Sequence, residues 1–454
     1  MRQRRTVQTS LFDQFSSHEI GLELKAMSDW LDQQPDLVGL VAADLDSGAV
    51  KPTGRQGLPA EAVLRCALLK QYRQLSYEEL AFHLEDSASF RAFARLPFGR
   101  NPKKSVLHKT IGRLRAETFE AINHTLLASA GKAKVEDGKL VRIDSTVTAA
   151  PIHPPSDSSL LYDAVRVTVR LLKAARRLGA RLPRRARDHR RAAKARLRVI
   201  EYTRSREKRR ATYRDLVKIT RASLTYLEEA TGALAGLATT AAERWRAEAA
   251  HMRPLIERVI EQTERRVFRG ETVPAADKVV SLFEPHADII IKGGRDVAYG
   301  HKLNLTTGKS GLILDLVVED GNPADSERLV PMLERHIAIY GQPPRQAATD
   351  GGYASRDNLA AAKALGVRDM AFHKKRGLAI EDMVKSRWVY RRLRNFRAGI
   401  EAGISCLKRG FGLARCTWRG LAHFKAYVWS AAVAYNLALL VRLLSPSGKR
   451  LAPT

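Results

Sequence analysis

Two aspartates in this sequence directly follow strand-like segments and could act together. Asp144 comes after the strand-like run 140–143, and Asp350 comes after the short run 345–349 and precedes a Gly-Gly pair that allows a sharp turn. Side chains at the ends of neighbouring strands in an α/β fold converge where ligands bind. Two carboxylates there would suit a hard divalent cation. Taken alone, an aspartate at a strand end is more often a helix cap or a turn residue.

A third acid lies in a helix-forming segment, residues 390–420. Helical spacing places Arg397, Glu401 and Lys408 along one side, because steps of four and seven residues span about one and two turns. Small and apolar neighbours surround Glu401, which predicts a setting less exposed than that of an ordinary surface glutamate. The alternative is an exposed Arg–Glu pair, which stabilises a helix only slightly.

The chain carries a large excess of positive charge. Its 454 residues include 78 Lys and Arg against 48 Asp and Glu, a formal net charge of +30, and 44% of them are hydrophobic. This composition supports real cores, allows two to four domains and excludes a disordered chain. Such a charge requires a polyanionic partner, and the general candidates are DNA, RNA and acidic membrane.

More than half of this excess charge lies between residues 166 and 221. The block contains 22 Lys and Arg against four acids. Like charges at this density repel one another unless a polyanion neutralises them, so the block predicts contact with a phosphate backbone. A solvated pair of helices, broken near Gly179 and Pro183, is the alternative. One cluster expected to contact phosphates is Arg184, Arg185, Arg190 and Arg191.

Cysteine usage and hydropathy limit the class of protein further. Cys66, Cys406 and Cys416 provide neither a disulfide framework nor a metal knuckle. No apolar stretch follows the basic N-terminus, so no secretory signal is expected. The uncharged segment 426–441 has 16 residues, whereas a bilayer requires roughly 20. We therefore expect a buried helix there, no membrane partner and a cytoplasmic protein.

Residues 15–125 have the spacing of short helices. Ser76 and Glu79 form a capping box at the start of one of them, and Ser105 is expected to cap another. The second helix could read a DNA groove, although ordinary helix packing with a basic surface is the alternative. Its exposed faces would carry Lys104, His108, Lys109 and Arg113.

From residue 138 the pattern changes to strand-like runs with a helical interruption. The run 312–320 has few polar residues on either face, which is typical of an interior strand. Residues 308–310 read Gly-Lys-Ser but lack the first glycine of a phosphate-binding loop, so they are interpreted as a hairpin turn. Asp157 is interpreted as a helix cap. Strands are expected within 139–152, 287–292, 300–307, 310–318, 345–350 and 369–375.

Three segments resemble the bacterial insertion-sequence transposases of the DDE type, which have a ribonuclease-H-like core. They are RIDSTVT (142–148), TDGGYAS (349–355) and RNFRAGIEAGISCLKRGFGLAR (394–415). The last resembles the Tyr-x2-Arg-x3-Glu-x6-Lys signature of the family, with Arg394 at its Tyr position. Residues 50–120 also resemble the helical N-terminal domain of such transposases.

This resemblance implies an enzyme that binds the ends of an insertion sequence and catalyses DNA strand cleavage and strand transfer. Asp144, Asp350 and Glu401 would hold two Mg2+ ions, which Mn2+ could replace, while Arg397 and Lys408 would bind phosphates. The partner would be double-stranded DNA, bound by a homodimer or larger assembly at the nucleoid. A metal-dependent nuclease without joining activity and a non-catalytic DNA-binding descendant remain alternatives.

The expected fold class is α/β, with a ribonuclease-H-like mixed sheet, a helical basic insertion and a preceding all-helical domain. The expected parts are a helical DNA-binding and assembly domain (1–125), the first part of the catalytic core (126–155), the basic insertion (156–270), the remainder of the core (271–410) and a C-terminal helical segment (411–454).

Overall fold

The computed structural model describes residues 18–46, 57–96, 99–183, 186–292 and 296–445. The chain divides into two compact units. The first combines residues 1–149 with 301–454, and the second is the intervening segment 150–300.

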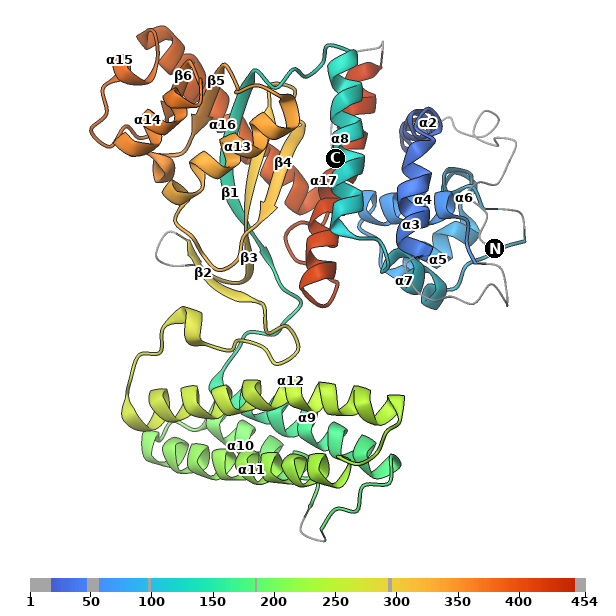
Figure 1. Cartoon of the computed structure of the whole chain (residues 1–454), viewed down its shortest axis with the longest axis vertical. Helices are drawn as coiled ribbons and strands as arrows, with labels where there is room; N and C mark the ends of the chain where they lie inside the picture. The colour runs from blue at the N-terminus through green and yellow to red at the C-terminus, as the bar shows by residue number, and fades with distance from the viewer. Residues whose placement is uncertain (1–17, 47–56, 97–98, 184–185, 293–295, 446–454) are drawn as a thin grey trace. The chain divides into compact units, whose positions relative to one another are not determined.

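The N-terminal part of the first unit is a cluster of short helices, as predicted (Figure 1). The helix α4 is its centre, because all thirteen of its residues are buried. The capping box of Ser76 and Glu79 is present at the start of α5. The helices are α2 (Glu19–Asp32), α3 (Asp36–Asp46), α4 (Ala60–Tyr72), α5 (Tyr77–Asp86), α6 (Ala88–Ala94), α7 (Lys104–Ile111) and α8 (Ala116–Lys132).

The prediction that Ser105 caps the next helix was wrong. The helix α7 begins at Lys104, and the extended residue before it is Lys103. Ser105 therefore lies inside the first turn, where its backbone is helical, whereas a capping residue needs an extended backbone. An ion pair of 3.0 Å between Lys104 Nζ and Glu78 Oε2 joins the start of α7 to α5.

The apolar helix α17 (Leu421–Leu444) completes this helical cluster. It packs against α8, α4 and α2 and also contacts strand β4. The helix is long and apolar enough to cross a membrane, but 72% of its most apolar 18-residue window is buried in the protein. Asn436 within it accepts a hydrogen bond from Ile313 N at 2.8 Å. The predicted buried helix is therefore confirmed.

A mixed six-stranded sheet follows the helical cluster. Its strand order is β2-β3-β1-β5-β6, with β4 also paired to β3. The pairs β1–β5 and β5–β6 are parallel, whereas β3–β4 and β2–β3 are antiparallel. The chain therefore has the predicted α/β core of the ribonuclease-H-like type. The strands are β1 (Leu140–Ala149), β2 (Asp288–Lys292), β3 (Asp296–Gly308), β4 (Ile313–Val318), β5 (Gln346–Thr349) and β6 (Asp369–Phe372).

Helices connect and cover the later strands of the first unit. The longest of them, α16, packs against β1, β5 and β6 and so spans the parallel part of the sheet. Two 3₁₀ turns, η3 (Asp325–Glu327) and η4 (Gly351–Tyr353), contact each other. The helices are α13 (Leu329–Tyr340), α14 (Arg356–Ala364), α15 (Ile380–Met383) and α16 (Arg387–Gly410).

The Gly-Lys-Ser stretch forms the hairpin turn between β3 and β4, as predicted. The buried carboxylate of Glu136 accepts hydrogen bonds from Ser310 N at 2.9 Å and from Ser310 Oγ at 2.6 Å. A Cβ on Gly308 would lie only 2.1 Å from Glu136 Oε2, so the carboxylate packs directly on the turn. The backbone N–H of Ser310, which would face a phosphate in a binding loop, thus donates to Glu136 instead.

The second unit contains a bundle of four helices, drawn in green in Figure 1. Leucine, isoleucine and valine side chains fill its core, and Trp245 Nε1 donates a hydrogen bond to Leu171 O at 2.9 Å. The first helix ends at Arg177, so the predicted break near Gly179 and Pro183 is confirmed. The elements are α9 (Asp157–Arg177), α10 (Arg190–Tyr202), α11 (Arg206–Ala233), α12 (Thr240–Thr263), the π-helix η1 (Glu264–Arg269) and the 3₁₀ turn η2 (Ala275–Asp277).

Candidate active site

The register of the parallel strands brings the two predicted aspartates together. Strand β1 pairs with β5 up to Ile143, whose partner is Thr349. The next residues along the two strands are Asp144 and Asp350, which therefore occupy neighbouring positions at the carboxyl end of β5. This is the edge of an α/β sheet at which ligands bind.

Asp144 does not end its strand, which corrects one expectation. Strand β1 continues to Ala149 because a second neighbour takes over from β5. The segment that follows α16 runs alongside it: Cys416 N donates to Ala149 O at 2.8 Å, and Thr148 Oγ1 donates to Leu413 O at 2.8 Å. Asp144 therefore lies in β1 directly beyond the end of its pairing with β5.

Arg397 on α16 links the three predicted acids. Its Nη2 donates to Asp144 Oδ2 at 3.0 Å and lies 3.8 Å from Asp350 Oδ1. Its Nη1 donates to Glu401 Oε1 at 2.7 Å, one helical turn further along. Two strands and one helix thus direct three carboxylates to a single guanidinium.

The cluster is buried on the sheet side and open on the other. The side chains of Asp144 and Arg397 are 13% and 11% exposed, whereas those of Asp350 and Glu401 are 42% and 67% exposed. The expectation that Glu401 is less exposed than an ordinary surface glutamate was therefore wrong. The small residues around it lie along the same helix and do not cover its carboxylate. Such an open side gives access to a bulky substrate.

Contacts that local sequence patterns did not reveal fix α16 against the sheet. Arg142 Nη1 donates to Phe396 O at 2.7 Å, Arg142 Nε donates to Thr307 Oγ1 at 2.9 Å, and the guanidinium lies 4.7 Å from the centre of the Phe396 ring. Burial lowers the pKa of Arg142 from its ordinary value. The only signals in the sequence were a charged residue in a largely apolar strand and a glycine, Gly399, inside a helix.

Tyr353, in the turn after Asp350, anchors this turn to β3. This is a second contact that the sequence did not reveal. The Tyr353 hydroxyl donates to Asn304 Oδ1 at 2.8 Å, and its ring is completely buried. Burial raises the pKa of Tyr353 above its ordinary value, so the hydroxyl keeps its proton and remains a donor. Asn304 in turn donates to Glu319 Oε1 at 2.7 Å. A buried polar network therefore supports the loop that carries the second aspartate.

The donor set fits a hard divalent cation in its chemistry. Carboxylate oxygens are the ligands that such ions prefer, and this cluster already stabilises one cationic group. Within the parts of the chain that the structure describes, no group of three or more His, Cys, Asp or Glu side chains is arranged to hold a metal ion. The three acids are instead spaced around the guanidinium of Arg397.

The other residues predicted to bind DNA lie at several places. Lys408 is half-buried on α16. Arg394, which stands at the signature Tyr position and is not one of the predicted DNA contacts, is exposed on the same helix. Lys109 is exposed on α7, whereas Arg113, just beyond the end of this helix, is half-buried and donates from Nη1 to Leu45 O at 3.0 Å. Lys104 is occupied by its ion pair with Glu78.

The second unit presents the predicted basic block on its surface. Arg191 is exposed on α10, and Arg190 forms an ion pair of 2.6 Å with Asp188. Arg184 and Arg185 lie outside the described residues. Further exposed cations on the bundle are Arg170, Lys173, Arg177, Lys194, Arg198, Arg206, Lys208, Arg209, Arg210, Arg214 and Lys218.

Asp157, interpreted as a helix cap, is the first residue of α9, and Ser156 caps the helix instead. Ser156 is the residue with the extended backbone, and its side chain accepts a hydrogen bond from Ser159 N. The buried carboxylate of Asp157 pairs with Arg266 at 2.9 Å. Desolvation by burial raises the pKa of this carboxyl. Asp157 therefore has a structural role in the second unit.

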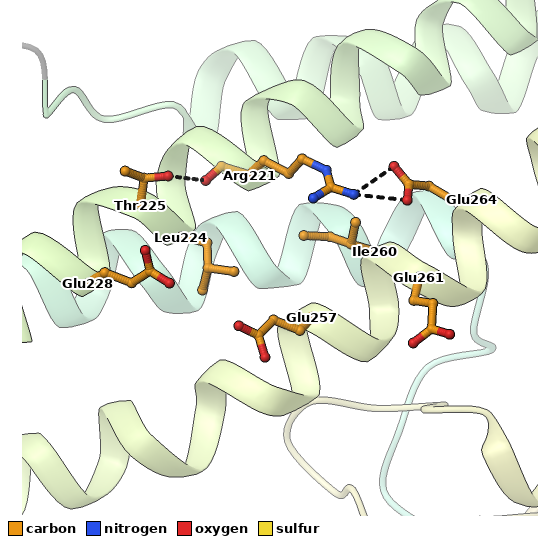
Figure 2. Close-up of a pocket in the computed structure, with 8 residues that line it drawn as sticks. All are labelled: Arg221, Leu224, Thr225, Glu228, Glu257, Ile260, Glu261 and Glu264. Carbon is orange, nitrogen blue, oxygen red and sulfur yellow. Dashed lines mark hydrogen bonds and ion pairs between the residues drawn. The ribbon is translucent and has the colours of Figure 1, made fainter.

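A groove between α11 and α12 is a rival candidate site (Figure 2). It has a volume of about 370 Å³, an apolar floor that includes Leu224 and Ile260, and four glutamates on its walls. Arg253 pairs with Glu228 at 2.8 Å and with Glu257 at 2.9 Å. Arg221 pairs with Glu264 at 2.9 Å, as Figure 2 shows. Arginines of the same bundle therefore pair with three of the four glutamates of the groove, so the groove does not indicate a cation site.

Comparison with known protein families is consistent with this geometry. The transposase DDE domain model matches residues 285–437, which include Asp350, Arg397 and Glu401. A second family model, the transposase domain (DUF772), matches residues 12–117 in the helical N-terminal part. No curated protein and no solved structure matched the chain.

A helical N-terminal region, a ribonuclease-H-like core and these two matches define the class of protein. The chain is a transposase of the DDE type, from the group encoded by insertion sequences.

Proposed function

We propose that this transposase binds the ends of its insertion sequence and catalyses DNA cleavage and strand transfer at Asp144, Asp350 and Glu401. The observation that carries the proposal is the strand register, which places Asp144 beside Asp350. Asp144 lies outside the matched DDE domain, whereas Asp350 and Glu401 lie inside it. The sheet would thus bring a third acid to the two that lie inside the match.

The three carboxylates would hold two divalent ions, Mg2+ or in its place Mn2+. When bound, such ions supply the activation of water or of a DNA 3′-hydroxyl and the stabilisation of the leaving oxygen. Asp144 and Asp350 would orient them from the rigid sheet, and Glu401 from the open side. Arg397 and Lys408 would donate hydrogen bonds to phosphate oxygens beside the scissile bond.

We further propose that contact with the DNA is divided among three regions. The exposed cations of α9, α10 and α11 would neutralise the phosphate backbone without reading sequence, because they are long, flexible point charges on a helical surface. The helical region of residues 1–125 would choose the element end through α7. Residues 126–155 and 271–410 would form the catalytic core, residues 156–270 the insertion and residues 411–454 a helical segment. A homodimer or larger assembly would act on double-stranded DNA.

The test is a cleavage and strand-transfer assay on labelled DNA that carries the element's terminal repeat, identified from the DNA that flanks the gene. With Mg2+, the wild-type protein should nick this DNA and join its 3′ end to a target. Asp144→Ala, Asp350→Ala and Glu401→Ala should each abolish both reactions and leave the gel shift nearly unchanged.

Other outcomes would contradict parts of the proposal. Cleavage without joining by the wild-type protein would indicate a nuclease. Binding without cleavage in Mg2+ or Mn2+ would indicate a non-catalytic DNA-binding protein. A substantially active acid variant would remove that acid from the site.

A further inference from the structure

The guanidinium of Arg397 is the cation that the two sheet aspartates share in this structure. Its Nη2 is 3.0 Å from Asp144 Oδ2 and 3.8 Å from Asp350 Oδ1. A divalent ion such as Mg2+ binds carboxylate oxygens at about 2.0–2.1 Å. A divalent ion held by Asp144 Oδ2 and Asp350 Oδ1 would therefore compete with the guanidinium for the same oxygens.

Electrostatics makes joint occupancy unfavourable as well. Two cations within a few ångströms of each other repel strongly where the surroundings have a low dielectric, and Arg397 is almost completely buried. The charges of the three carboxylates and the guanidinium add up to −2, against −3 for the acids alone. With Arg397 in place, the site is therefore both filled and less attractive to a divalent ion.

We infer that Arg397 is a cation gate, which must leave the acids before they bind divalent metal ions and which then binds the DNA phosphate. This inference rests on the proposed function. It assigns Arg397 two alternative partners, the acids without metal and a phosphate with it. The fork of an arginine matches the oxygens of either group, so the same guanidinium can bind one or the other.

The gate makes metal binding and DNA binding help each other. Metal ions displace the guanidinium and make it available to a phosphate, and a phosphate draws it away from the acids. Thermodynamic linkage requires the two effects to be equal in size. The protein would thus bind metal weakly until the scissile phosphate is present.

The test uses the full-length protein and measures Mn2+ binding directly, by electron paramagnetic resonance of free Mn2+ and by calorimetry. Arg397→Ala should bind Mn2+ at least tenfold more tightly than wild type in the absence of DNA. Addition of a DNA duplex that carries the terminal repeat should tighten Mn2+ binding to wild type and leave that of Arg397→Ala nearly unchanged. Arg394→Ala, which removes an exposed charge one turn away on the same helix, is the matched control and should alter Mn2+ binding less than twofold.

A second measurement shows whether a variant is folded. Thermal unfolding of Arg397→Ala in EDTA should begin at a lower temperature than that of wild type, because three carboxylates then repel one another, and Mn2+ should raise its Tm by more than it raises that of wild type.

The outcomes separate the gate from the proposed function. If Asp144→Ala abolishes Mn2+ binding but Arg397→Ala binds Mn2+ no more tightly than wild type, the metal site stands and the gate is wrong. If wild type and Arg397→Ala both fail to bind Mn2+ with or without DNA, the gate and the metal-dependent function fall together. If Mn2+ affinity increases as much in Arg394→Ala as in Arg397→Ala, the increase comes from the lost positive charge alone and the gate is wrong.

Discussion

Gly399 on α16 lies directly against Arg142 on β1. A Cβ at residue 399 would come within 2.3 Å of Arg142 Nη1, the same atom that donates to Phe396 O. A side chain at residue 399 would therefore require the guanidinium of Arg142 to move, and with it the hydrogen bond that joins α16 to the strand that carries Asp144. The position of Glu401 and Arg397 relative to the sheet depends on this contact.

Gly399→Ala should impair catalysis while DNA binding persists. The new methyl group must displace either Arg142 or the helix, and a displacement of about 1 Å at a reacting site can lower rates about a hundredfold. Loss of the hydrogen bond from Arg142 should also make the free energy of unfolding about 1 kcal/mol lower than that of an alanine variant elsewhere on the helix that keeps this bond. Cleavage kinetics and urea unfolding measure the two effects.

Gly403→Ala is the control for this prediction, because the nearest atom to its Cβ would be 3.9 Å away. It should leave the cleavage rate near its wild-type value and raise the free energy of unfolding by up to about 1 kcal/mol, because alanine favours a helix interior over glycine. Equal effects from the two alanines would show that helix propensity alone is responsible.

Arg191→Ala should reduce the salt dependence of DNA binding more than Arg190→Ala. Arg190 is already paired with Asp188, whereas Arg191 is exposed on the same helix. Removal of one phosphate-binding side chain should reduce the slope of log K against log salt by about one unit. Titrations at several salt concentrations on the terminal repeat and on random DNA provide the measurement, and both DNAs should respond alike. Equal slopes for the two variants would contradict the prediction.

Lys109→Ala and Arg113→Ala should affect different properties although both lie near α7. Lys109 is exposed, so its loss should reduce the preference for the terminal repeat over random DNA without changing Tm. Arg113 donates to Leu45 O, so its loss should lower the free energy of unfolding by about 1–2 kcal/mol. Competition gel shifts and thermal unfolding of both variants measure the difference. A repeat preference that survives Lys109→Ala would remove this residue from the proposed contact surface.

Acid should weaken the folded state through His336, which is buried on α13 and stacked on Tyr340. Burial lowers the pKa of His336 to about 4, below the ordinary value of about 6.5. The unfolded chain therefore binds the proton more readily, and the stabilising contribution, complete above pH 6.5, is lost as the pH falls toward 4. Its slope is roughly 1.4 kcal/mol per pH unit in that window.

His336→Phe should stack on Tyr340 without taking up a proton. Its free energy of unfolding, measured in urea at pH 6.5 and pH 5, should therefore fall less than that of wild type. An equal fall in both proteins would assign the acid sensitivity to other groups.

The three acids could be predicted because each stands in a recognisable local pattern. Asp144 and Asp350 directly follow strand-like runs, and Glu401 lies four residues after Arg397 and seven before Lys408 in a helix-forming segment. The strand register that makes Asp144 and Asp350 neighbours follows from pairing between segments two hundred residues apart, which local patterns do not specify. The same holds for the second neighbour of β1 and for the hydrogen bond from Tyr353 to Asn304. The exposure of Glu401 was misjudged because small neighbours along a helix say nothing about what lies opposite it.

The packing of α17 determines which parts of this protein can fold first during synthesis. This helix fills the core between α2, α4 and α8, elements that precede it by about three hundred residues or more. During synthesis the N-terminal helices therefore emerge from the ribosome long before the apolar surface that covers them. The first unit cannot complete its core until residue 444 has been translated, whereas the bundle of residues 150–300 has its own core and can fold earlier. A message interrupted before α17 would thus yield a folded basic bundle joined to an incomplete catalytic unit.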